Sequence, residues 1–128
     1  MKRLIEILIK NGYEIKILSE DLVEIHTKEL LPNNDLLSIY LIYKNGTIIL
    51  LEEDSIFELD IVEKINIKEL KKIAKKYNIN LNIELQEFYK ENINEFNIIE
   101  NLKNIINTAL EAGKLLIKKE NKTGNKNI

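Results

Sequence analysis

Two apolar runs joined by the dipeptide Asn45-Gly46 constrain the fold of this chain more than any other feature. Asparagine and glycine tolerate the positive φ angles of a type I′ turn, and a two-residue turn fixes the register of the strands beside it. In that register, the strands expected over residues 37–44 and 47–52 are mainly apolar on both faces. Because both faces then need cover, we expect this hairpin in the middle of a covered antiparallel sheet.

The rest of the chain shows the two periodicities of regular secondary structure. Apolar residues spaced three and four apart predict helices over residues 1–11, 66–78 and 94–116. Alternation of apolar and polar residues predicts a hairpin over residues 13–27 and a strand or small hairpin over residues 79–89.

These elements predict a single α+β domain. We expect an antiparallel sheet of four or more strands with the Asn-Gly hairpin at its centre, one N-terminal helix, and two C-terminal helices covering one or both faces. The length of 128 residues fits one compact domain, which we place at residues 1–117. Residues 118–128 hold four lysines and a single apolar residue, so we expect a disordered basic tail there. A short helical turn is expected around residues 55–59.

The composition excludes several classes of enzyme. With no cysteine and the single histidine His26, the chain lacks the usual ligands of structural zinc sites, thiol nucleophiles and histidine-led triads. We therefore expect no cofactor and no enzymatic activity. No apolar run approaches the roughly 20 residues of a membrane-spanning helix, and Glu6 interrupts the apolar N-terminal segment. We expect a cytoplasmic location and no contact with a membrane.

Charge is unevenly distributed along the chain. Residues 20–63 carry eleven acidic residues against two lysines, whereas residues 64–128 carry thirteen lysines against eight acidic residues. This division predicts an acidic region around the sheet and its turns beside basic helices.

The order of elements resembles an uncharacterised prokaryotic domain family of bacteria, archaea and phages. The core of that family is a strand, a Gly turn, a second strand ending in Leu-Thr-Asp-Asp-Gly, a short Thr-Ile-x-x-Leu element and a Lys-rich helix. The matching parts of this chain are Tyr40 to Lys44, Asn45-Gly46, Thr47 to Leu51, Glu52-Glu53-Asp54, Ser55-Ile56 with Leu59, and Lys68 to Ile79. Leu51 to Asp54 depart from the family pattern. The resemblance implies this fold and a mobile-element or phage setting, but no activity.

The acidic run Glu52-Glu53-Asp54 directly follows a predicted strand. Carboxylate oxygens are the ligands that Mg²⁺ prefers, so one hypothesis is a metal site. However, alternation along a strand sends Glu52 and Asp54 to one side and Glu53 to the other. We favour the second interpretation, in which the run hydrates the end of a strand and places negative charge near the next helix.

Five lysines follow the polar side of the helix predicted over residues 66–78. They could neutralise phosphates of a nucleic acid. Base recognition also uses arginine and aromatic side chains, and the chain has a single arginine, Arg3. We favour a solvated helix face for these lysines, which are Lys68, Lys71, Lys72, Lys75 and Lys76.

Two shorter motifs have weaker functional interpretations. Glu14-Ile15-Lys16, with Glu6 upstream, formally matches the Glu-x-Lys element of metal-dependent nucleases, but such tripeptides are expected by chance in a chain rich in these residues. His26 falls on the same strand face as Glu24, which could make it a general base, but no nucleophile is evident nearby. We interpret His26 as a half-exposed strand residue.

These observations predict a small interaction or regulatory domain, with a protein partner or a second copy of the chain bound at the less covered face of the sheet. The alternative is a nucleic-acid-binding or Mg²⁺-dependent nuclease-like protein.

Overall fold

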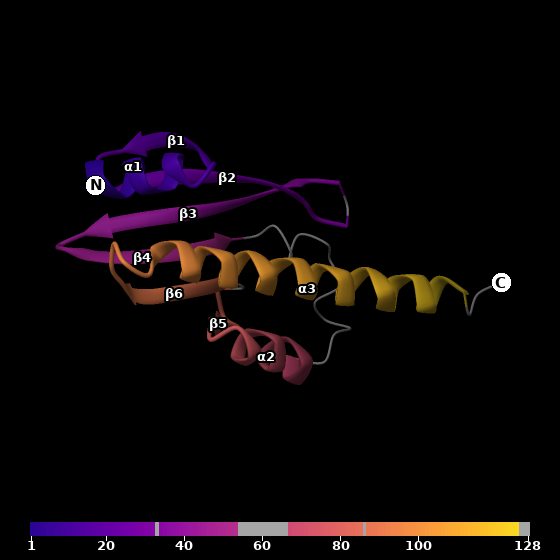
Figure 1. Ribbon diagram of the computed structural model, residues 1–128. Coiled ribbons are helices and arrows are strands. Elements are labelled where there is room, and N and C mark those ends of the chain that lie inside the picture. Colours follow the sequence, from indigo (N-terminus) through magenta and orange to yellow (C-terminus); the bar gives the residue numbers. More distant parts are fainter. Residues whose placement is uncertain (33, 54–66, 86, 126–128) are drawn as a thin grey trace.

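The computed structural model describes the backbone of residues 1–32, 34–53, 67–85 and 87–125 (Figure 1). The described part is one α+β domain with a six-stranded antiparallel sheet in the order β1-β2-β3-β4-β6-β5, which confirms the predicted fold class. The elements are α1 (Lys2–Lys10), β1 (Glu14–Ser19), β2 (Leu22–Leu30), β3 (Leu36–Lys44), β4 (Thr47–Glu53), α2 (Ile67–Lys76), β5 (Asn80–Asn82), β6 (Glu87–Ile93) and α3 (Ile98–Asn125).

The Asn-Gly turn joins the two central strands, as predicted. Asn45 and Gly46 have φ angles of 53° and 77°, the positive values that a type I′ turn requires. Lys44 then faces Thr47 across the turn. Because β3 and β4 are the third and fourth strands of six, their register sets which side chains of the whole sheet share a face.

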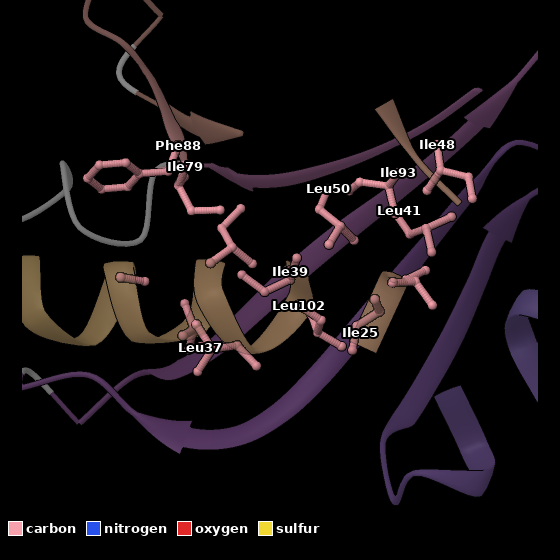
Figure 2. Close-up of a cluster of buried hydrophobic side chains, with 14 of the residues drawn as sticks. Ile25, Leu37, Ile39, Leu41, Ile48, Leu50, Ile79, Phe88, Ile93 and Leu102 are labelled. Atoms are coloured by element: carbon pink, nitrogen blue, oxygen red, sulfur yellow. The ribbon is translucent and has the colours of Figure 1, made fainter. Parts of the chain in front are cut away.

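One face of the sheet carries the hydrophobic core. We call this side of the sheet the inner face. Its buried apolar side chains are Val23, Ile25, Leu37, Ile39, Leu41, Ile48, Leu50, Phe88 and Ile93. Figure 2 shows Ile39 and Leu50 of the sheet lying close to Leu102 of α3. Ile98, Ile105 and other apolar residues of the same helix are also fully buried. The inner face is therefore covered mainly by α3.

The two shorter helices join the same layer. Leu4 of α1 lines a small cavity with Ile48 and Ile93 of the inner face, and Arg3 Nε lies 2.7 Å from Glu95 Oε2 in the loop before α3. α2 packs beside α3 and β5 through its buried residues, Leu70 and Ala74. Figure 1 shows α3 lying along the sheet with α2 beside it.

Only one face of the sheet is covered by the helices that the structure describes. We expected the helices to cover one or both faces of the sheet. The three helices form one layer, since each has an apolar stripe that joins the single buried cluster. The opposite face has no helix over it in the described part of the chain.

All three predicted helices are present, although α3 begins at Ile98 and not at residue 94. Asn78 takes a φ of 57° just after α2 and so ends it, as we predicted. α3 continues past residue 117, where we expected the domain to end, and runs to Asn125. Lysine and glutamate, which fill much of this stretch, favour helices and allow such an extension. The turn predicted around residues 55–59 lies outside the described residues.

The loop between β2 and β3 packs against α3 at Gly113. A Cβ atom at Gly113 would lie only 3.0 Å from Cδ of Pro32 and 3.6 Å from Cδ2 of Leu31. Glycine at this helix position therefore allows the loop to approach the helix closely.

The central turn gives a direct test of the fold. We expect Gly46→Val to lower the free energy of unfolding by about 1 kcal/mol or more, because a β-branched residue resists positive φ. Space does not limit the substitution, since no atom lies within 4 Å of the added Cβ. Urea unfolding measures the change, with Gly46→Asn as the control because asparagine tolerates this conformation. Equal stability of Gly46→Val and the parent would contradict the type I′ turn.

Candidate interaction surface

The face of the sheet turned away from the helices is called the outer face. Strand register places its residues in transverse rows, one of which runs Lys16, Glu24, Tyr40, Leu51 and Tyr89 across five strands. A neighbouring row aligns Leu22, Ile42 and Ile49, and a third aligns Glu14, His26 and Ser38.

The centre of the outer face is apolar. Its six large side chains are all half-buried, whereas most apolar side chains of the inner face are fully buried. Cross-strand neighbours on one face lie close enough to shield one another, which contributes to partial burial where none of the described helices lies above the strands. The apolar centre consists of Leu22, Tyr40, Ile42, Ile49, Leu51 and Tyr89.

A polar flank borders this apolar centre on the β1 side. Lys28 Nζ lies 3.3 Å from Glu14 Oε1, and both side chains are well exposed. His26 Nε2 lies 3.6 Å from Glu24 Oε1, which confirms that the two share a face. The outer face therefore combines an apolar centre with charged residues at one side.

His26 also has a neighbour that sequence reasoning missed. Ser38 lies directly opposite His26 in the β2–β3 register, so a hydroxyl, an imidazole and the Glu24 carboxylate occur together on the outer face. A serine nucleophile would need a hydrogen bond to the imidazole, and the side-chain contact that the structure gives for His26 is the one with Glu24. The flat, polar arrangement fits a solvated surface better than a catalytic site.

The residues of the Glu-x-Lys motif do not come together as a metal site. Lys16 lies opposite Glu24 on the outer face, and Glu14 forms its ion pair with Lys28. Glu6 is exposed on α1, in the helix layer. These positions divide the three predicted residues between the two sides of the sheet.

The acidic run is likewise divided. Glu52 is fully buried in the core cluster on the helix side of β4. Glu53 pairs with Glu87 of β6 through the backbone, and Asp54 lies outside the described residues. Within the described ranges, no group of three acidic or histidine side chains is arranged to hold a metal ion.

The five lysines predicted as nucleic-acid ligands are all exposed on α2. Lys76 is tied to the neighbouring helix, because its Nζ lies 3.0 Å from Glu111 Oε1 and 5.1 Å from the centre of the Tyr77 ring. The hydrogen bond from Lys76 lowers the pKa of Glu111, and the same bond raises the pKa of Lys76. α2, which carries these lysines, packs beside β5 and α3.

A polar cleft of about 520 Å³ lies between the β5–β6 side of the sheet and the start of α3. Six asparagine side chains supply most of its lining, and amides offer both hydrogen-bond donors and acceptors. No sequence signal identified this cleft, because its residues come from separate segments of an asparagine-rich chain. The lining residues are Asn78, Asn80, Lys90, Glu91, Asn92, Asn97, Glu100, Asn101 and Asn104.

Phe96 is the most exposed large apolar side chain of the described part, at 87%. A reciprocal cap holds its loop, since Asn94 Oδ1 accepts hydrogen bonds from the Phe96 and Asn97 amides while Asn97 Oδ1 accepts one from the Asn94 amide. The exposed ring is therefore held on an ordered turn.

Comparison of the chain with protein families, with curated proteins and with solved structures finds no match. The resemblance to the prokaryotic domain family therefore stays a prediction. In the described part of the chain, no helix has the length and apolar character to cross a membrane.

The divided acidic run leads to a prediction about metal binding. We expect millimolar Mg²⁺ to cause no saturable rise in the melting temperature, because Glu52 is buried in the core and cannot join a hydrated ion. Thermal unfolding with increasing Mg²⁺ measures this, with a variant carrying Glu52→Gln, Glu53→Gln and Asp54→Asn for comparison. A saturable rise in the parent that the triple variant loses would establish the metal site instead.

Proposed function

We propose that this chain is a protein-interaction domain that binds a protein partner on the outer face of its sheet. One observation supports this most strongly: the central strands are apolar on both faces, but the described helices cover only the inner face. Large contiguous apolar patches are rare on soluble monomers and mark interaction sites when polar residues border them.

The composition of the outer face suits a protein interface. Tyr40 and Tyr89 lie in the same transverse row on either side of Leu51. Tyrosine is enriched at the centres of protein interfaces, where it combines a large apolar area with a polar hydroxyl. A surface built on hydrogen-bonded strands also needs little rearrangement on binding, which lowers the entropic cost of association.

The charges beside the apolar centre describe the partner further. The flank on the β1 side carries both signs, with Glu14 and Glu24 beside Lys16 and Lys28. A partner with an apolar surface bordered by both acidic and basic side chains would match the apolar centre and this mixed flank. Such complementarity accelerates association and excludes unsuitable partners.

The alternative, a nucleic-acid-binding or nuclease-like protein, has one supporting observation. α2 presents five exposed lysines, although Lys76 is already paired with Glu111. Binding through this helix would weaken steeply with salt, since it depends on counterion release from phosphates. Burial of the apolar outer face would persist as the ionic strength rises.

Retrieval of the tagged protein from its native cells, with and without nuclease, separates these functions. We expect a protein partner that survives nuclease treatment. The purified partner should then bind the double variant Ile42→Thr and Ile49→Thr at least about tenfold more weakly, a loss of about 1.4 kcal/mol. Threonine keeps the β-branched shape that strands favour, so the change removes apolar surface with little effect on the strand.

A matched control carries Ile83→Thr and Leu85→Thr. These side chains are 42% and 63% exposed near the β5–β6 turn, away from the outer face. Calorimetry of each variant with the partner should show a weakened affinity for the first pair only. Loss of all partners on nuclease treatment, or equal binding by both double variants, would refute docking on the outer face.

A further inference from the structure

Strand β1 forms one edge of the sheet. It pairs with β2 on one side, and Figure 1 shows no described element beyond it on the other. Its side chains Ile17 and Leu18 are 60% and 43% exposed, and Ile9 of the adjacent α1 is 57% exposed. A free strand edge with exposed apolar side chains is a template for pairing with another strand.

We propose that a second copy of this chain pairs with β1 through its own β1, antiparallel, about a twofold axis at Ile15. Such an axis stands perpendicular to the sheet and keeps the helix layers of both copies on the same side. Residues that face one another across the axis must therefore belong to the same face of the sheet.

The residue pairs in this register are complementary. Glu14 of each copy lies opposite Lys16 of the other, which gives two opposite-charge pairs on the outer face. Tyr13 lies opposite Ile17, an aromatic and β-branched pair, and Ile15 meets its own copy. Each kind of pair stabilises antiparallel strands.

Neighbouring registers of the two β1 strands do not place Glu14 opposite Lys16. An axis at Glu14 or at Lys16 places that charged residue directly opposite itself, and an axis at Ile17 brings Glu14 opposite Glu20. Like charges that face each other directly destabilise a strand pair. The β1 sequence therefore favours the axis at Ile15 over the adjacent alternatives.

Lys16 has a second consequence at this edge. A lysine in the middle of an edge strand usually opposes strand addition, because its charge must be accommodated beside the new strand. Here the second copy supplies Glu14 opposite it. The other edge strand, β5, has only three residues, so pairing through β1 closes as a dimer and does not propagate into a fibre.

Dimerisation through β1 would join the two sheets into one, with both outer faces on the same side. If the outer face binds a protein as proposed above, the dimer presents two docking surfaces side by side and binds a bivalent partner with increased avidity. The dimer itself does not depend on that function, because it is measured without any partner.

Molar mass by light scattering tests this assembly over about 10 μM to 1 mM chain, a range that spans weak and moderate dimers. We expect the parent to approach twice its 15.0 kDa with rising concentration. Glu14→Lys and Lys16→Glu should each remain monomeric, since each places like charges opposite one another. An equimolar mixture of these two variants should form mixed dimers, because the charges are then complementary in both pairs.

Dimers formed in the mixture would show that each variant alone fails to dimerise because of charge repulsion in this register. Variants that had lost their folded structure would not form dimers on mixing. Lys44→Glu makes the same charge change at an exposed position away from β1 and should dimerise like the parent. A monomeric parent over the whole range would overturn the proposal, as would dimers of Lys16→Glu alone. A failed dimer would leave the outer-face binding experiment unaffected, so the two proposals fail separately.

Discussion

The packing of α3 on the inner face of the β3–β4 hairpin is the interaction on which the rest of the structure depends. Leu102, Ile105, Ala109 and Ala112 of α3 are all fully buried in the same cluster as the apolar side chains of the inner face. Full burial of one such leucine or isoleucine contributes about 1.5–3 kcal/mol, so this contact outweighs any single surface interaction of the domain. α1 and α2 add their shorter apolar stripes to the same buried cluster.

This one-sided layering connects the fold to both proposals. The described helices gather on the inner face, so within the described ranges no helix lies over the apolar residues of the outer face. The same arrangement leaves the β1 backbone at a free edge. A surface for a partner and an edge for a second copy thus follow from the same placement of the helices, although they use different groups.

Local signals in the sequence predicted the parts of the fold that depend on neighbouring residues. Asn45-Gly46 specifies a turn by its own backbone preferences, and the turn fixes the central register. The position of the helix layer could not be predicted in this way. The apolar stripe of a helix shows that the helix packs on another surface, but it does not show which of two apolar sheet faces the helix covers. Alternation assigned Glu52 and Glu53 to opposite faces, but it could not tell that Glu52 would lie in the core.

The candidate functional surfaces also depend on tertiary packing, which local sequence signals do not specify. The pairing of Ser38 with His26, and the polar cleft beside α3, arise from segments that only tertiary packing brings together. α3 also runs to Asn125, past the helix end predicted at residue 116, because lysine favours helices and lets a helix continue beyond its apolar stripe.

The solvent exposure of isoleucine methyl groups, measured by NMR, tests most directly whether the helices cover only one face of the sheet. Ile39 and Ile48 lie on the inner face, whereas Ile42 and Ile49 lie on the outer face of the same two strands. We expect a soluble paramagnetic probe to broaden the methyl NMR signals of Ile42 and Ile49 strongly, and those of Ile39 and Ile48 very little. Equal protection of all four in the monomeric Lys16→Glu variant would show that both faces are covered and would contradict the outer face as a binding surface.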